Sequence, residues 1–220
     1  MLTIVFDLDG TLIDTAPDLV DTLNSILARE GLPPVPFSLA RTMIGGGAKG
    51  MIESALAAEG RAMADGEIDR LYAAFIGHYA AHIADRSRPF PELEATLKQL
   101  AAAGHRLAVC TNKLEWLSRR LLDTLQLADR FAAICGQDTF GMQKPDPEVF
   151  RLTVRRAGGE PERAIMVGDS KTDVHTARAA RVPVVAVDFG YSDVPIASLE
   201  PDRIISSFAD LPGAVVDLAG

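Results

Sequence analysis

The sequence predicts an α/β protein in which a doubly wound parallel sheet carries an inserted, all-helical domain. An unbroken apolar run at residues 2–6 is typical of a parallel strand covered on both faces. Short apolar strands alternate with amphipathic helices from about residue 85 onward, whereas no strand pattern occurs between residues 16 and 85. We therefore expect a sheet domain made of residues 1–14 and 85–220, and a helical domain made of residues 15–84.

The first strand ends in two acidic residues. Side chains alternate along a strand, so Asp7 and Asp9 should point to the same side, and Gly10 allows a sharp turn after them. Two carboxylates this close disfavour joint ionisation unless a cation lies between them or one keeps its proton. Hard oxygen ligands favour Mg²⁺. For these residues alone, a surface turn with a helix-capping Asp is the alternative interpretation.

Residues 15–84 have the pattern of successive helices. Thr15 is the expected N-cap of the first helix, Pro17 and Asp18 lie in its first turn, and Gly31 ends it. Further helices are expected at residues 38–44, 48–58 and 68–83, separated by a glycine cluster at 45–47 and a linker at 60–66. A helical block of this length indicates an inserted domain rather than a single crossover helix.

From residue 88 the chain alternates between helix and strand. The segment 106–110 is an apolar strand that ends at Thr111, and the segment 164–167 is another that ends at Gly168. Further strands are expected at 132–135, 182–187 and 203–205, and helices at 91–103, 114–125, 147–157 and 174–180. This alternation predicts a parallel, Rossmann-like sheet that binds ligands at the carboxyl ends of its strands.

Polar residues that follow separate strands should meet at that edge of the sheet. They are Asp7, Asp9, Thr111, Asn112, Lys144, Asp169 and Asp173. Phosphoryl transfer uses each of these types, because one carboxylate can attack phosphorus, a second can pass a proton to the leaving oxygen, and a lysine with a hydroxyl can stabilise charge. Asp169 would be a further metal ligand, and Asp173 would orient Lys144 or a metal-bound water.

The same residues form four short motifs in a fixed order. They are Asp7-Leu8-Asp9-Gly10-Thr11-Leu12 followed by Asp14, then Thr111-Asn112, then Lys144-Pro145, and finally Gly168-Asp169-Ser170 with Asp173. In this order the sequence resembles the haloacid dehalogenase superfamily over its whole α/β part. The resemblance implies a Rossmann-like catalytic domain with a helical cap, inserted after the first motif, which closes over the site and excludes water.

The resemblance also implies a role for each residue. Asp7 would be the nucleophile and Asp9 the general acid and base. Phosphate would be bound by Thr111, Asn112 and Lys144. Mg²⁺ would be held by Asp7, the main-chain carbonyl of Asp9, and Asp169, with Ser170 and Asp173 supporting the site.

Details within the superfamily narrow the expected reaction. Its dehalogenases lack the second acid of the first motif, so the presence of Asp9 favours phosphate chemistry over dehalogenation. Its phosphonatases carry a lysine on the first cap helix. Residues 17–31 contain no lysine, which argues against a phosphonatase. The runs at 111–113, 136–139, 144–147 and 44–48 look most like phosphoglycolate phosphatases. This likeness implies hydrolysis of 2-phosphoglycolate to glycolate and phosphate through an aspartyl phosphate on Asp7.

Proteins with several other activities share the same motifs and fold. Among enzymes they are a pyrophosphatase, a sugar-phosphate phosphatase and a β-phosphoglucomutase-like phosphomutase. A non-enzyme alternative is a receiver or regulatory module that carries phosphate on Asp7. Receivers are shorter and have no inserted cap, so the helical domain and Asp9 favour an enzyme that turns over.

The glycine cluster of the helical domain is expected to form a hinge or a loop that faces substrate. Gly45, Gly46 and Lys49 are the candidate substrate contacts in this region. Arg41 and Lys113 are further cations that could meet the remote end of an anionic substrate.

Composition limits the partners and the compartment. The 220 residues are 48% hydrophobic with a formal net charge of -8 and scattered basic residues, which argues against nucleic acid and leaves a small phosphorylated metabolite as the expected partner. No apolar stretch could span a bilayer and no leader pattern precedes the first strand, so we expect a cytoplasmic protein. An apolar face of the helical domain could form a dimer or pack on the core, which leaves both a monomer and a homodimer open. Cys110 and Cys135 lie in apolar stretches typical of buried thiols.

Overall fold

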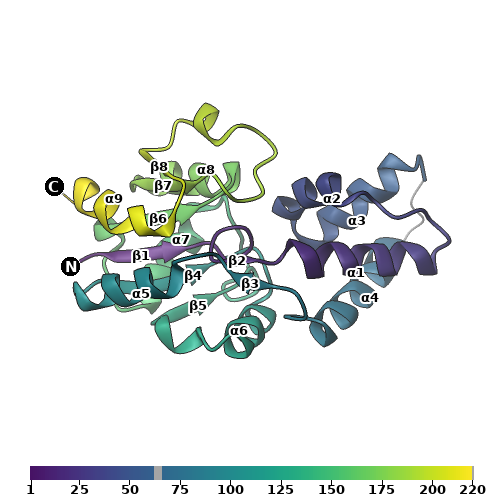
Figure 1. The fold of residues 1–220 in the computed structure, drawn as a ribbon, viewed down its shortest axis with the longest axis horizontal. Coiled ribbons are helices and arrows are strands. Elements are labelled where there is room, and N and C mark those ends of the chain that lie inside the picture. The colour runs from purple at the N-terminus through teal and green to yellow at the C-terminus, as the bar shows by residue number, and fades with distance from the viewer. Residues whose placement is uncertain (62–65, 220) are drawn as a thin grey trace. The chain divides into compact units, whose positions relative to one another are not determined.

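The computed structural model describes residues 1–61 and 66–219 (Figure 1). Its contacts divide the chain into two compact units. The core unit is Met1–Asp14 together with the residues from Arg88 on, and the helical unit is Thr15–Ser87. Residues 62–65, part of the expected 60–66 linker, lie outside the described residues. No helix in the described ranges is long and apolar enough to cross a membrane.

The core unit contains a six-stranded parallel sheet with the strand order β5-β4-β1-β6-β7-β8. β1 (Thr3–Phe6) lies between β4 (Arg106–Cys110) and β6 (Ala164–Gly168). The outer strands are β5 (Ala133–Cys135), β7 (Val184–Val187) and β8 (Arg203–Ile205). Every residue of β1 is buried, as an unbroken apolar strand covered on both faces requires.

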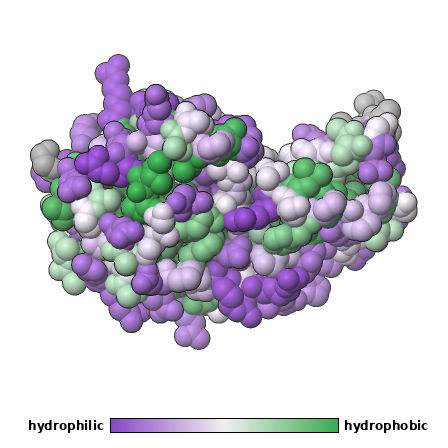
Figure 2. Space-filling view, turned by 45° about the horizontal axis from the view of Figure 1, so that its top comes forward, coloured by the Kyte–Doolittle hydropathy of each residue, from purple (hydrophilic) through white to green (hydrophobic). Residues whose placement is uncertain are grey.

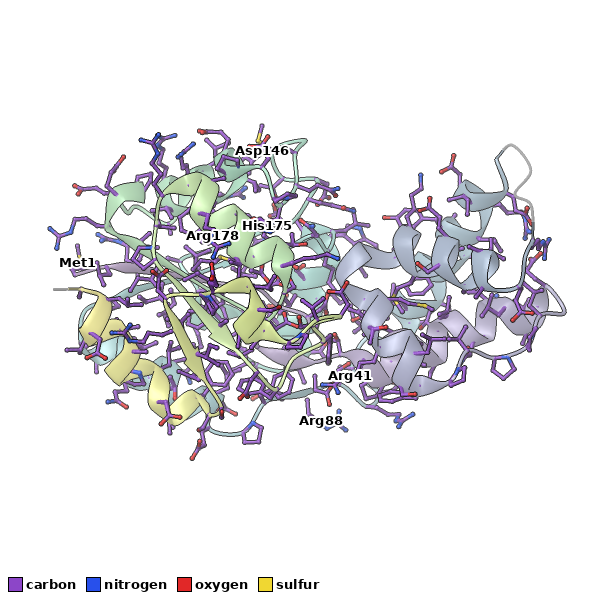
Figure 3. The ribbon with its side chains drawn as sticks, turned by 90° about the horizontal axis from the view of Figure 1, so that it is seen from above. Met1, Arg41, Arg88, Asp146, His175 and Arg178 are labelled. Carbon is purple, nitrogen blue, oxygen red and sulfur yellow. The ribbon has the colours of Figure 1, made fainter. Side chains whose placement is uncertain are left out.

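Helices cover both faces of this sheet (Figures 1 and 3). On one face α7 (Pro147–Arg156) packs against α8 (Lys171–Ala180), and on the other α5 (Leu93–Ala102) packs against α9 (Leu211–Leu218). α6 (Glu115–Thr124) packs against β5. Arg178 of α8, labelled in Figure 3, donates to the carbonyl oxygens of Leu199 (2.6 Å) and Glu200 (2.9 Å) and ties α8 to the loop before β8. The predicted fold class is confirmed.

Two short strands pair where the chain leaves and re-enters the core unit. β2 (Ile13–Asp14) runs antiparallel to β3 (Arg88–Pro89), with Asp14 opposite Arg88. Neither this pair nor α9 was expected from the sequence, because two-residue strands and an eight-residue helix that begins Leu-Pro-Gly carry too little periodicity. Single turns of 3-10 helix occur at Ile44–Gly46, Ala128–Arg130, Pro161–Arg163, Ile196–Leu199 and Phe208–Asp210.

The helical unit contains α1 (Ala16–Arg29), α2 (Phe37–Met43), α3 (Gly47–Ala58) and α4 (Glu67–Ala81). These bounds differ from the expected ones by one or two residues. α4 packs against both α1 and α3. The apolar side chains that these helices bury include Leu23 and Ile26 of α1 and Phe75 and Tyr79 of α4.

The molecular surface is mixed in polarity. Figure 2 shows polar residues interrupted by apolar patches on the face in view. The large exposed apolar side chains of the described residues include Phe37 and Leu39 of α2 and Trp116 of α6. Exposed apolar side chains are ordinary on the surface of a folded protein.

One buried carboxylate holds the two ends of the helical unit together. Asp18, in the first turn of α1, is 2% exposed. It accepts hydrogen bonds from the N–H of Arg86 (3.0 Å), the N–H of Ser87 (2.8 Å) and the hydroxyl of Ser87 (2.6 Å). These bonds satisfy main-chain donors at the last two residues of the unit, of which Ser87 is buried away from water.

We predict that Asp18→Ala destabilises the protein by about 2–4 kcal/mol, because it removes a charged acceptor and leaves buried donors without a partner. Urea unfolding of the variant and the wild type measures the difference. Asp21→Ala is the matched control, since Asp21 is exposed and forms a surface ion pair with the Arg86 side chain (2.7 Å). Its effect should stay within about 1 kcal/mol. Equal losses in the two variants would contradict this assignment.

Candidate active site

Asp7 is the first residue beyond β1 and lies at the carboxyl edge of the sheet. Its N–H donates to the carbonyl of Val167 (2.9 Å), so the pairing of β1 with β6 continues to the residue that bears the carboxylate. Oδ1 of Asp7 lies 2.9 Å from Nζ of Lys144, and 13% of the Asp7 side chain is exposed. The carboxylate is thus fixed by the sheet and partly accessible.

The turn after Asp9 packs against Asp169, the residue that follows β6. Gly10 has a φ of +82°, and a Cβ there would lie 2.5 Å from Oδ2 of Asp169, so both conformation and space require glycine. The hydroxyl of Thr11 donates to Oδ1 of Asp169 (3.0 Å). The N–H of Tyr191 donates to Oδ2 of the same residue (2.6 Å). Asp169 is therefore oriented from two sides by separate segments of the chain.

Lys144 joins Asp7 to Asp173. Its Nζ lies 2.6 Å from Oδ1 of Asp173, and 2% of its side chain is exposed. Asn112 fixes the main chain of Lys144, since its side chain accepts from the Lys144 N–H (2.9 Å) and donates to the Lys144 carbonyl (3.0 Å). The N–H and hydroxyl of Ser170 donate to Oδ2 of Asp173 (3.1 and 2.6 Å) in a capping box that begins α8.

Thr111 and Asp9 each contact Lys113, which lies in the loop between β4 and α6. The hydroxyl oxygen of Thr111 accepts from the Lys113 N–H (3.3 Å). Nζ of Lys113 lies 2.9 Å from Oδ1 and 2.8 Å from Oδ2 of Asp9. The structure thus brings together the seven candidates that follow the strands, and it adds Lys113 to them.

Burial and mutual repulsion dominate the electrostatics of the acids. Burial raises the pKa of Asp7 to about 6, with Lys144 opposing the rise and Asp173 adding to it. Burial also raises the pKa of Asp169 to about 8, and the charges of Asp173 and Asp7 add to that rise. Burial alone would lower the pKa of Lys144, but Asp173 and Asp7 outweigh it and hold that pKa above its ordinary value. Lys144 therefore stays charged at neutral pH.

The acids at this edge fit a divalent cation. Asp7, Asp169 and Asp173 each offer a carboxylate oxygen, and these oxygens lie within 4.8 Å of one another. Oδ1 of Asp7 is buried, and the Lys144 ammonium 2.9 Å away is the group that faces it. Hard oxygen donors that repel one another suit Mg²⁺. The side chain of Asp9 faces Lys113 instead, which leaves its main-chain carbonyl as the atom expected to bind the metal.

The remaining predicted site residues belong to the helical unit. Gly45 and Gly46 form part of a 3-10 turn, and Lys49 lies in the first turn of α3. Nζ of Lys49 lies 2.8 Å from Oδ1 of Asp69 in an exposed ion pair. The contact of Gly45, Gly46 and Lys49 with substrate stays a prediction.

Sequence reasoning missed Tyr191 as a residue of this site. Besides its bond to Asp169, its hydroxyl donates to Oδ1 of Asp14 (2.5 Å), and its side chain is buried. The neighbouring Gly190 packs so closely on Asp169 that a Cβ there would overlap it. A glycine and an aromatic residue shortly after the expected strand at 182–187 were the available signal. That signal is weak, because turns after strands commonly contain glycine.

Comparison with known proteins places the chain among similar sequences and structures. The model of the family described as haloacid dehalogenase-like hydrolase matches residues 4–187. The phosphoglycolate phosphatase of Mesorhizobium japonicum is 51% identical over 93% of this chain and 90% of its own length. The corresponding protein of Caulobacter vibrioides is 47% identical over 98% and 91%. A crystal structure of a predicted phosphoglycolate phosphatase from Haemophilus somnus superposes with a TM-score of 0.90 at 31% identity, over 97% of each chain.

The raised pKa values predict how the stability of the metal-free protein depends on pH. Asp7 and Asp169 bind protons more tightly in the folded state, with pKa values of about 6 and about 8, than the ordinary value of 3.8. Their contribution to stability is therefore present at low pH and lost as pH rises through about 6 and then about 8. With a chelator present, the unfolding temperature at the alkaline end of this pH range should be lower than at the acidic end by roughly 5 °C or more.

Asp169→Asn isolates this effect from the other titrating groups. An amide does not ionise, so the variant should lose much less stability over the same pH window than the wild type does. Mg²⁺ should raise the unfolding temperature of the wild type most at the alkaline end of the pH range, where both carboxylates are ionised and can bind the ion. Differential scanning calorimetry measures all of these differences. Identical pH profiles for wild type and variant would refute the assignment.

Proposed function

Because this chain belongs to the haloacid dehalogenase-like hydrolase family, we propose that it is an Mg²⁺-dependent phosphatase that hydrolyses 2-phosphoglycolate to glycolate and phosphate. Family membership and the named relatives make it a phosphoric monoester hydrolase. The observation that carries the proposal is the contact of Asp7 with the buried Lys144, with Asp169 and Asp173 alongside. The substrate is proposed from the names of relatives as much as 51% identical.

In the first half of the reaction Asp7 is the nucleophile. One of its carboxylate oxygens attacks phosphorus while the bond from phosphorus to the leaving oxygen breaks. Asp9 gives its proton to that oxygen, which leaves as the hydroxyl of glycolate. Lys144 lies 2.9 Å from Asp7, so its charge stabilises the phosphoryl oxygens as they pass to the carboxylate.

In the second half water hydrolyses the aspartyl phosphate. Asp9 takes a proton from the water, whose oxygen attacks phosphorus, and the bond between phosphorus and the Asp7 oxygen breaks. Phosphate leaves, Asp7 is again a carboxylate, and Asp9 again carries the proton that the next cycle needs. Two residues keep Lys144 in place throughout. Asp173 contacts the Lys144 ammonium, and Asn112 bonds to the Lys144 main chain.

Mg²⁺, when bound by Asp7, the Asp9 carbonyl and Asp169, would neutralise negative charge on the phosphate and on the nucleophile. Thr11 and Tyr191 orient Asp169 for that role. Thr111, Asn112 and Lys144 are the proposed phosphate-binding residues. The helical unit is proposed as a cap over the core unit, with Gly45, Gly46 and Lys49 facing the substrate.

We predict that Asp7→Asn folds but loses phosphate release from 2-phosphoglycolate by at least roughly 1,000-fold, because an amide is a poor nucleophile and a poor metal ligand. A chelator should abolish release by the wild type, and Mg²⁺ should restore it. Release is measured against a panel that also contains pyrophosphate, sugar phosphates and other small esters. Asp123→Asn, which changes an exposed acid on α6, should retain the activity of the wild type.

Each other outcome excludes part of the proposal. Preference for pyrophosphate or a sugar phosphate would reject the substrate but keep the nucleophile. An isomerised sugar phosphate without released phosphate would indicate a phosphomutase. Activity of Asp7→Asn near that of the wild type would reject Asp7 as the nucleophile.

A further inference from the structure

We propose that Lys113 is the residue that recognises an acidic group on the leaving half of the substrate. It would select phosphate esters of 2-hydroxy acids over esters of neutral alcohols. The inference rests on the proposed function, because it takes Asp9 as the proton donor. It adds that the site recognises an acidic group on the part of the substrate that leaves.

Lys113 is a buried cation that contacts Asp9, the proposed proton donor to the leaving oxygen. Nζ of Lys113 lies 2.9 and 2.8 Å from the two carboxylate oxygens of Asp9, and 7% of the Lys113 side chain is exposed. Lysine side chains are rarely buried to this extent without an anion to hold them. A lysine that merely covered the surface would instead extend its ammonium into water.

The main chain of Lys113 is fixed. Its N–H donates to the hydroxyl of Thr111 (3.3 Å), and its carbonyl accepts from the N–H of Gln137 (3.1 Å). Gly136 packs directly on this loop, and a Cβ there would overlap the carbonyl of Lys113 and the N–H of Glu115. The ammonium is thus carried by a rigid segment, which is the usual requirement for a residue that discriminates between ligands.

The Lys113 ammonium lies within reach of the leaving group. A proton donor must lie about 2.6–3.2 Å from the atom that it protonates. Nζ of Lys113 is 2.8 Å from Asp9, so it lies no more than about two hydrogen-bond lengths from the leaving oxygen. In 2-phosphoglycolate a single carbon separates that oxygen from the carboxylate. The carboxylate therefore arrives close to the Lys113 ammonium, which has three donors to share between two anions.

The charges of the site support the same assignment. Lys144, the other buried lysine at this edge of the described core unit, already contacts both Asp7 and Asp173 and serves the phosphoryl group. Lys113 is on the side of Asp9, where the leaving group must lie. A substrate carboxylate there gains a charge-assisted hydrogen bond, whereas a neutral group does not.

Two esters of matched size test the proposal. 2-Phosphoglycolate and 2-hydroxyethyl phosphate differ in carrying a carboxylate or a hydroxymethyl group on the same carbon. In Lys113→Met, which keeps an unbranched side chain one atom shorter and removes its charge, the ratio of kcat/KM for the two esters should fall by about 10- to 100-fold. Lys113→Arg should keep most of the ratio. Glycolate should inhibit the wild type and Lys113→Arg more strongly than Lys113→Met.

Lys98→Met, which changes an exposed lysine of α5, is the control and should leave the ratio unchanged. If Lys113→Met lowers kcat/KM equally for both esters, Lys113 only positions Asp9 and the proposal is wrong. The proposal is also wrong if Lys113→Arg loses the ratio as fully as Lys113→Met does. If the wild type cleaves other esters but not 2-phosphoglycolate, the proposed substrate fails. The role of Lys113 is then tested with two esters that the enzyme does cleave, one with a carboxylate on the leaving group and one without, by the same ratio of kcat/KM.

Discussion

Repulsion among carboxylates at one edge of the sheet is the constraint on which the rest of the core unit depends. Asp7, Asp169 and Asp173 place oxygens within 4.8 Å of one another, in surroundings that raise the pKa values of Asp7 and Asp169. Such an arrangement opposes folding unless cations and hydrogen-bond donors compensate for it. Lys144 supplies the charge, and Thr11, Ser170 and Tyr191 supply the donors. The stability of this edge of the sheet therefore depends on these few contacts.

The sheet makes this crowding possible because its register is rigid. β1 lies between β4 and β6, so Asp7, Thr111 and Asp169 follow three adjacent parallel strands. The glycines at 10, 168 and 190 lie where a Cβ would overlap the side chain of Asp169 or Asp173. Their absence of a side chain lets backbone and carboxylate approach each other closely. The positions of these glycines are thus a consequence of where the acids must lie.

The sequence was informative wherever the local pattern decides the structure. Apolar runs located the inner strands, and the alternation with helices placed Asp7, Thr111 and Asp169 at one edge. It was uninformative where long-range packing decides, as for the bond of Tyr191 to Asp169 across 22 positions or of Lys113 to Asp9 across 104. Neither contact has a periodicity that a pattern could reveal. The C-terminal helix was missed because eight residues carry too little signal.

The pairing of β2 with β3 has a consequence for how such proteins diversify. Asp14 and Arg88 lie opposite each other, so the chain leaves the core unit and returns to it at neighbouring points. Any segment spliced between these two residues would meet the same pair of ends and leave the sheet undisturbed. The insertion point can therefore accept a longer, shorter or different segment over evolution without a change in the strands of the sheet.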